Sequence, residues 1–192
     1  MTTDVMEKPA KVAINGVDVP TLLGTIGAVG EQPVAAQFQF RANGAWVNGT
    51  HSRASINGFF GAGQEHERSE AFVADGDHPA VLCGGDNAPT PIEYLLSALA
   101  ACITAGIANI ASARQIKLNA VNVKVEGDID LQGLLGLDNS VRNGFQKIRA
   151  VVEIDGDADA EKLGKVVQQS IARSAVFDML KNGTDVDVRM AA

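Results

Sequence analysis

The chain has 192 residues, of which 46% are hydrophobic and 20% are charged. This length and composition predict one globular domain with a sizeable core and exclude an intrinsically disordered protein. Lys and Arg number 16 against 23 Asp and Glu, a net charge of -7 without any basic cluster, which excludes nucleic acid and anionic membrane surfaces as partners. Two cysteines, Cys83 and Cys102, are too few for a disulfide scaffold. Met1 to Lys11 lack the apolar core of a signal peptide, so we expect a cytoplasmic protein with free thiols.

The N-terminal part of the chain is predicted to be an extension over residues 1–34, ahead of one domain over residues 35–192. We expect a loosely ordered start over residues 1–17. A short helix is predicted at Val19–Val29, because Pro20 suits the first turn of a helix, although the glycines in this segment weaken it.

The first half of the domain carries the signals of short strands separated by turns. An extended stretch is predicted to begin at Pro33, and Asn43-Gly44 is predicted to be the turn before a strand at Trp46-Val47. Further short strands are expected near Ala54–Phe60 and Glu70–Val73.

A helix over residues 91–113 has the clearest start in the sequence. Thr90 is predicted to cap it, with Pro91 at the first position and Glu93 at the third, which is the capping-box pattern. Tyr94–Ala113 then runs without a charge over about the length of a membrane span. Its many Ala, Ser and Gly residues favour instead the buried helix of a soluble protein.

The second half of the domain contains two strand patterns and one helix pattern. Val121–Glu126 and Ile148–Ile154 have apolar side chains at every second position, which predicts antiparallel strands with one face in water. Residues 131–144, between them, are predicted to form an excursion with a short helical turn. Asp159 is predicted to cap a second helix with one apolar stripe.

The end of the chain is predicted to form a turn at Asn182-Gly183 and a last strand, in which Val186, Val188 and Met190 alternate with polar residues. Together these elements predict an α+β fold of antiparallel strands and two principal helices. The helix over residues 91–113 is apolar nearly all round, which is more than the rest of one domain can cover. A second copy of the chain would cover the remainder, so we predict a homodimer.

Cys102, in the middle of this helix, has two interpretations. It is either a buried thiol that serves as a small hydrophobic side chain, or a reactive thiolate. Because burial raises the pKa of a thiol, a thiolate needs a cation. The helix supplies none, and the upstream candidates are Arg41, Arg53 and Arg68.

The run Asp86–Cys102, DNAPTPIEYLLSALAAC, resembles the signature of the OsmC/Ohr family, the osmotically inducible protein C and organic hydroperoxide resistance proteins. Arg173–Asp178 is similar to the end of the family's second helix. Val121–Glu126 followed by Gly127–Asp130 also fits the family. The resemblance extends over residues 35–190.

This resemblance implies an OsmC-like fold, with antiparallel sheets wrapped around two central helices in an intertwined homodimer. It implies a thiol-dependent peroxidase whose active site lies at the dimer interface. Cys102 takes the role of the peroxidatic cysteine, which attacks an organic or inorganic hydroperoxide and becomes a sulfenic acid. Arg53, with Arg41 as the second choice, is expected to stabilise the thiolate and polarise the peroxide. No metal or other cofactor is implied, and the electrons come from an external small or protein dithiol.

Two positions depart from the family pattern. Where the family carries its second, resolving cysteine, this chain has Ser174-Ala175, and a serine forms no disulfide. Cys83 is either a stand-in resolver or a plain packed or surface thiol. The glutamate that pairs with the arginine in the family falls at Ile92. Glu93, one residue later, is either a catalytic carboxylate or only the cap of the helix.

The main prediction is therefore a cytoplasmic, homodimeric hydroperoxide reductase that works through Cys102. The alternative is a catalytically degenerate OsmC-like protein that binds a small apolar molecule or senses peroxide by oxidation without turnover. The acidity of the Cys102 thiol separates the two, because only the enzyme needs a reactive thiolate near neutral pH. The three histidines, His51, His66 and His78, do not stand at metal-ligand spacing with the cysteines.

Overall fold

The computed structural model describes residues 12–191, and its elements form the predicted α+β fold with antiparallel sheets. The chain divides into two compact units. We call residues 24–97 the sheet unit, and residues 12–23 together with 98–191 the hairpin unit. Two helices, α1 (Val19–Glu31) and α2 (Pro91–Ala113), continue from one unit into the other.

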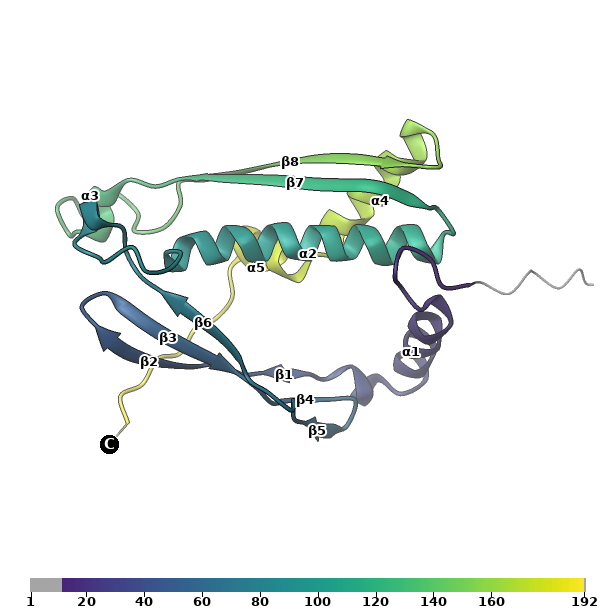
Figure 1. Ribbon diagram of the computed structural model, residues 1–192, viewed down its shortest axis with the longest axis horizontal. Coiled ribbons are helices and arrows are strands. Elements are labelled where there is room, and N and C mark those ends of the chain that lie inside the picture. The colour runs from purple at the N-terminus through teal and green to yellow at the C-terminus, as the bar shows by residue number, and fades with distance from the viewer. Residues whose placement is uncertain (1–11, 192) are drawn as a thin grey trace, which may run out of the picture. The chain divides into compact units, whose positions relative to one another are not determined.

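The sheet unit contains two antiparallel three-stranded sheets, with the strand orders β1-β4-β5 and β2-β3-β6 (Figure 1). Its elements are η1 (Pro33–Ala36), β1 (Gln39–Phe40), β2 (Asn43–Asn48), β3 (His51–Ile56), β4 (Phe59–Gly61), β5 (Gln64–His66), β6 (Phe72–Gly76) and η2 (Ala80–Leu82).

Two local predictions for this unit are wrong. Pro33 opens a 3-10 helix rather than an extended stretch, because the fixed φ of proline also suits the first position of a helical turn. Asn43 and Gly44 do not form a turn but begin β2, where Asn43 pairs with Ser55. The turn falls at Gly49-Thr50, where Gly49 has φ +55°, a conformation that glycine adopts readily.

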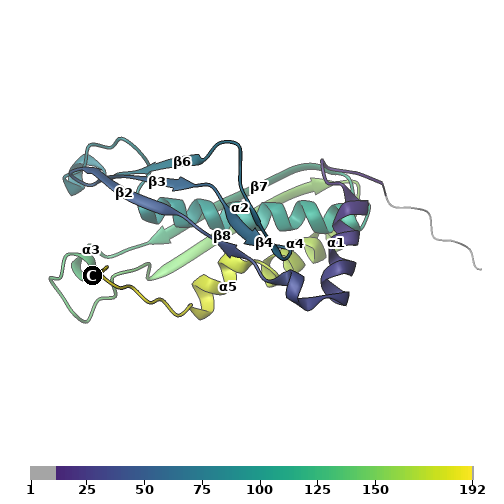
Figure 2. The same cartoon turned by 90° about the horizontal axis from the view of Figure 1, so that it is seen from below.

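The hairpin unit contains a long antiparallel hairpin of β7 (Leu118–Asp128) and β8 (Lys147–Gly156), as the alternating patterns predicted. The excursion between them holds the short helix α3 (Leu131–Leu134). Then follow α4 (Ala160–Ala172), capped by Asp159 as predicted, and α5 (Ala175–Asn182). Figures 1 and 2 show the hairpin running along α2, with α4 close to the end of the same helix.

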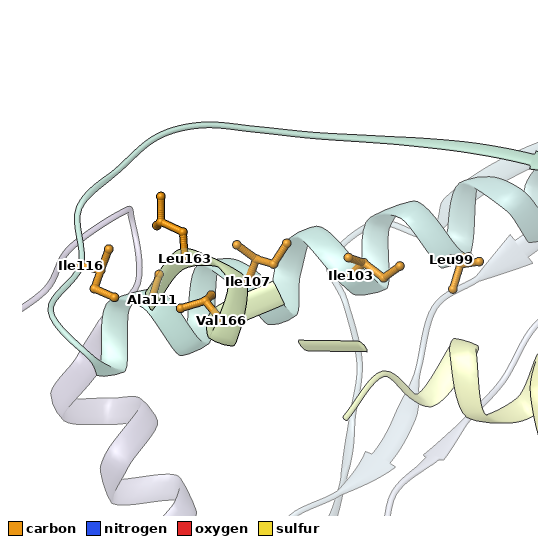
Figure 3. Packing of buried hydrophobic residues seen from close by; sticks show 7 residues of the cluster. All are labelled: Leu99, Ile103, Ile107, Ala111, Ile116, Leu163 and Val166. Atoms are coloured by element: carbon orange, nitrogen blue, oxygen red, sulfur yellow. The ribbon is translucent and has the colours of Figure 1, made fainter. Parts of the chain in front are cut away.

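The core of the hairpin unit forms along one stripe of α2. Leu99, Ile103, Ile107 and Ala111 are buried at a spacing of four residues, which places them on one face of the helix. Ile116 and the α4 residues Leu163 and Val166 complete this cluster (Figure 3). The inward-facing residues of β7 and β8 pack against it: Val121, Val123, Val125, Ile148, Val152 and Ile154.

Among the described helices, α2 is long and apolar enough to cross a membrane by length and composition alone. The same helix carries the buried stripe just described, as the core helix of a soluble protein does. This agrees with the interpretation of Tyr94–Ala113 as a core helix.

The N-terminal extension is attached to the end of α2. The short helix predicted at Val19–Val29 is present as α1, two residues longer. Predictions for residues 1–11 lie outside the described part of the chain. Residues 12–17, expected to be loosely ordered, are instead held by Asn15, whose amide Nδ2 donates to the Ile116 carbonyl over 2.9 Å and whose Oδ1 accepts from Leu118 N over 2.9 Å.

The last predicted strand is absent. Residues 183–191 have no strand structure, and Val186, Val188 and Met190 are 81%, 88% and 96% exposed. A strand needs an edge that pairs with its backbone groups, and no strand of the described residues supplies one here. The prediction of a strand at this position is therefore wrong for the single chain.

Candidate active site at Cys102

Cys102 lies at the middle of α2, where α4 approaches closely. A Cβ atom on Gly106 would lie 2.3 Å from the Oγ atom of Ser170, so only glycine permits this approach. Ser170 is buried and its hydroxyl donates to the Ile103 carbonyl over 2.8 Å. This contact fixes the last turn of α4 beside α2, one helical turn from Cys102.

The junction between α4 and α5 brings Ser174 to the cysteine. Ser174 is the N-cap of α5, and its Oγ accepts a hydrogen bond from Phe177 N over 3.1 Å. The same hydroxyl donates to Cys102 Sγ over 3.1 Å. Ser174 is only 4% exposed, whereas Cys102 is partly exposed. The cysteine is therefore partly exposed, while its hydrogen-bond donor is buried.

These contacts make the thiol more acidic. Burial raises the pKa of Cys102, but the Ser174 hydroxyl and the backbone N–H groups of Val176 and Ala175 together lower it more. The net pKa lies below the ordinary value of a cysteine. Hydrogen bonds to the charged form and a helix N-terminus both favour a thiolate. Neutral donors therefore lower the pKa of this thiol, whereas the sequence predicted a cation in this role.

Arg53, the first candidate for that cation, lies on β3 in the sheet unit. It forms a two-pronged ion pair with Asp75 on the neighbouring strand β6, with Nε–Oδ1 and Nη2–Oδ2 distances of 2.6 and 2.8 Å. Its guanidinium is the main cause that lowers the pKa of Asp75 to about 2. Tyr94, in the first turn of α2, donates its hydroxyl to the Asp75 carbonyl over 2.6 Å. Arg53 is thus a fixed but exposed cation.

The second choice, Arg41, is already paired with a carboxylate. It donates to both oxygens of Glu65 over 2.9 and 2.8 Å, and also to the side chain of Gln39. Arg68 lies over the rings of Phe59 and Phe72, 5.3 and 5.2 Å from their centroids.

Glu93 forms the predicted capping box. Its Oε2 accepts hydrogen bonds from Thr90 N over 2.7 Å and from Thr90 Oγ1 over 2.8 Å. In return, Glu93 N donates to Thr90 Oγ1 over 3.3 Å. These bonds lower the pKa of Glu93, so the carboxylate is charged and engaged at the start of α2. The capping interpretation is confirmed, and a catalytic role stays a prediction.

Cys83 lies in a different environment. It is exposed, has φ +62°, and lines a hollow of about 260 Å³ in the sheet unit together with His51 and Asp77. Asp77 is buried and organises this loop, because its carboxylate accepts hydrogen bonds from Thr50, His78, Gly85 and Asn87. Both cysteines are free thiols.

The predicted residues are divided between the two units. Cys102 and Ser174 belong to the hairpin unit, whereas Arg53, Glu93 and Cys83 belong to the sheet unit. Within residues 12–191, no group of three or more His, Cys, Asp or Glu side chains is placed to hold a metal ion.

Sequence reasoning missed two partners. The sequence marks Ser174 as the position of the missing resolving cysteine, but serine is also a preferred N-cap residue, and this was the available signal. No sequence pattern indicates Asp75 as a partner of Arg53, because this pairing depends on the register of β3 and β6.

Comparison with known proteins identifies the family. The OsmC-like protein family matches residues 84–189, more than half of the chain. The chain therefore belongs to the OsmC-like family, as the sequence resemblance implied. Comparison with curated proteins gave no match.

Solved structures show the same fold. An OsmC-like protein from Mycoplasma pneumoniae is 17% identical, with a TM-score of 0.56 over 74% of this chain and 87% of that chain. An organic hydroperoxide resistance protein OsmC from Legionella pneumophila is 15% identical, with a TM-score of 0.53 over 78% of this chain and 94% of that chain. A protein from Psychrobacter arcticus, described as an osmotic stress induced and detoxification response protein, is 13% identical, with a TM-score of 0.55 over 74% and 88% of the two chains.

Proposed function

We propose that this protein is a thiol-dependent peroxidase that reduces organic or inorganic hydroperoxides through Cys102. The observation that carries the proposal is the partly exposed Cys102 thiol, whose pKa is lowered by Ser174 and the first turn of α5. Membership of the OsmC-like family supports a redox role in stress, and the Legionella pneumophila relative is described as an organic hydroperoxide resistance protein.

In the first chemical step the Cys102 thiolate is the nucleophile. Cys102 Sγ attacks one oxygen of the peroxide, the O–O bond breaks, and the leaving alkoxide takes a proton to become an alcohol. The sulfur is oxidised by two electrons to a sulfenic acid. An external dithiol then returns the two electrons, is itself oxidised to a disulfide, and releases water. A low thiol pKa favours the first step because the thiolate is the nucleophile.

Arg53 is the residue that we assign to the peroxide. Its ion pair with Asp75 orients the guanidinium, and a positive charge beside the breaking O–O bond would stabilise the developing alkoxide. In the predicted homodimer the active site lies at the dimer interface, as the family resemblance implies. A cytoplasmic location supplies the reducing thiols that this cycle consumes.

The second candidate is a catalytically degenerate protein that binds a small apolar molecule or senses peroxide. The observation that favours it is Ser174 in the place of a resolving cysteine. A sensor would accumulate oxidised Cys102 without turnover, and a binding protein would leave Cys102 unmodified.

The test is a peroxide-consumption assay of the reduced protein beside a Cys102→Ser variant. Cumene hydroperoxide and hydrogen peroxide serve as substrates, with dithiothreitol or dihydrolipoamide as reductant, and mass spectrometry reports the state of each thiol. We expect turnover that vanishes in the variant. Absence of turnover with an unmodified Cys102 would contradict the peroxidase and favour the binding protein, and oxidation without turnover would favour the sensor.

A further inference from the structure

We propose that Ser174 is a positioning residue of a one-thiol centre: its hydroxyl holds the Cys102 sulfur as a thiolate, and the oxidised cysteine is resolved by an external thiol through a mixed disulfide. This inference rests on the proposed peroxidase function and specifies its reductant. It follows from three features of the Ser174–Cys102 contact.

The first feature is the direction of the Ser174 proton. A hydroxyl has one proton to donate, and the Ser174 oxygen already accepts from Phe177 N. Its proton is directed to Cys102 Sγ, 3.1 Å away. A neutral thiol sulfur is a weak acceptor, whereas a thiolate is an anion that forms a charge-assisted hydrogen bond. The arrangement therefore favours the deprotonated sulfur, and burial of Ser174 keeps the hydroxyl in place.

The second feature is the neutrality of the donors within the hairpin unit. Among the described residues, α2 has no charged side chain after Glu93. The charged residues next to the junction are exposed: Arg173 at the C-cap of α4, and Asp178 and Lys181 on α5. None of them contributes to the pKa of Cys102. Removal of the Ser174 hydroxyl should therefore change the acidity of this thiol without disturbing an ion pair.

The third feature is the position of Ser174 as the nearest partner of the sulfur. Its oxygen lies 3.1 Å from Cys102 Sγ, at the sequence position where the family carries its resolving cysteine. Cys83 lines its hollow with residues of the sheet unit alone, and its loop is fixed by the hydrogen bonds of Asp77. Since Ser174 forms no disulfide, the sulfenic acid remains available to a thiol from solution.

The resolving steps balance as follows. The external thiol attacks the Cys102 sulfur, an S–S bond forms, and the sulfenic hydroxyl leaves as water with the proton of that thiol. A second thiol, or the second group of a dithiol, then attacks the mixed disulfide. This step regenerates the Cys102 thiolate and releases the oxidised reductant as a disulfide.

The first experiment measures how fast iodoacetamide alkylates Cys102 as a function of pH, with the alkylated peptide quantified by mass spectrometry. In Ser174→Ala, we expect the midpoint of the pH profile to rise and the rate at pH 7 to fall about tenfold, the size expected for loss of a hydrogen bond to a charged group. Ser174→Thr keeps the hydroxyl and should restore the profile. Ser140→Ala, which removes a hydroxyl bonded to Asp138 in a distant loop, should not change it. Circular dichroism checks that every variant is folded.

The second experiment follows the product of one equivalent of cumene hydroperoxide in the absence of reductant. In the wild-type protein, we expect a sulfenic acid on Cys102 that dimedone traps, and a mixed disulfide on the same residue after addition of glutathione. In Ser174→Cys, an intramolecular disulfide between Cys102 and the introduced thiol should replace both products, because a sulfur in place of the Ser174 oxygen would lie close to bonding distance.

The outcomes separate this inference from the proposed function. An unchanged alkylation profile in Ser174→Ala, or a Cys83–Cys102 disulfide in the oxidised wild-type protein, would overturn the inference even if peroxide is consumed. A shifted profile in a protein whose Cys102 does not react with peroxide would support the positioning role of Ser174 and contradict the peroxidase function.

Discussion

At the scale of single residues, acidity and charge at the candidate site come from different parts of the chain. The pKa of Cys102 is lowered by uncharged groups of its own unit, Ser174 and the first turn of α5. Arg53 is fixed by Asp75 within the sheet unit. We therefore propose that the arginine acts not on the acidity of the thiol but on the leaving oxygen of the peroxide, which it would stabilise.

This division of roles predicts different effects for the two arginine candidates. Arg53→Met should lower kcat/KM for cumene hydroperoxide about 100-fold, as removal of one donor to a developing anion does. The alkylation rate of Cys102 should change much less. Arg41→Met removes a comparably exposed arginine that is also paired with a carboxylate, Glu65, and should leave turnover within about twofold, a change that corresponds to less than 0.5 kcal/mol.

Steady-state peroxide consumption by the two variants, with melting curves as a control for folding, checks this prediction. Equal losses in both variants would indicate that the sheet unit, rather than Arg53 itself, has been damaged. A loss confined to Arg41→Met would make Arg41 the peroxide-binding residue.

At the scale of elements, local chemistry explains which predictions succeed. The start of α2 was predictable because Thr90 and Glu93 cap it within a few residues. The prediction of a turn at Asn43-Gly44 failed because the pairing with β3 decides where β2 begins and ends. Strand register is a non-local property.

The candidate site follows the same rule. Cys102 stands out through its local motif, but its hydrogen-bond partner Ser174 is 72 positions away. The pairing depends on how α4 packs on α2, which no local pattern encodes. The exposed segment with Val186 and Val188 shows the converse, because a local strand pattern has no effect without a partner edge.

The contact between α2 and α4 gives a prediction at this scale. Gly106→Ala should destabilise the protein by about 1–2 kcal/mol, because the added methyl displaces the Ser170 hydroxyl from its bond to Ile103 and overpacks the contact. This cost outweighs the gain in helix propensity of up to about 1 kcal/mol. The same substitution at Gly164 on α4, where a Cβ would meet no atom within 4 Å, should stabilise the protein.

Urea unfolding of both variants measures these changes, and the alkylation rate of Cys102 in Gly106→Ala reports whether the site moves with α4. In a Ser170→Ala background the cost of Gly106→Ala should be smaller, since the displaced hydroxyl is gone. Stabilisation by Gly106→Ala equal to that by Gly164→Ala would show that the close approach carries no strain.

At the scale of the whole molecule, α2 carries a buried stripe and an exposed apolar one. Its buried stripe, Leu99 to Ala111, packs on the hairpin unit, whereas Ala98, Ala101 and Ala105 are exposed on another side of the helix. Small side chains allow close approach of another helix. An exposed apolar stripe on a long apolar helix is typical of an interface, which supports the proposed homodimer.

Ala101→Arg should therefore disrupt the dimer. An arginine at this position would bury an unpaired charge against the second copy, a cost of several kcal/mol that corresponds to more than about 100-fold weaker association. Ala160→Arg, at an exposed alanine at the start of α4, serves as the matched control and should leave the dimer intact. Sedimentation velocity over a range of concentrations measures both.

If the active site is completed by the second copy, peroxide turnover should fall in Ala101→Arg in proportion to the monomer fraction, and higher protein concentration should partly restore it. A wild-type protein that sediments as a monomer at micromolar concentration would contradict the dimer, and a monomeric Ala101→Arg with full turnover would place the whole active site within one chain.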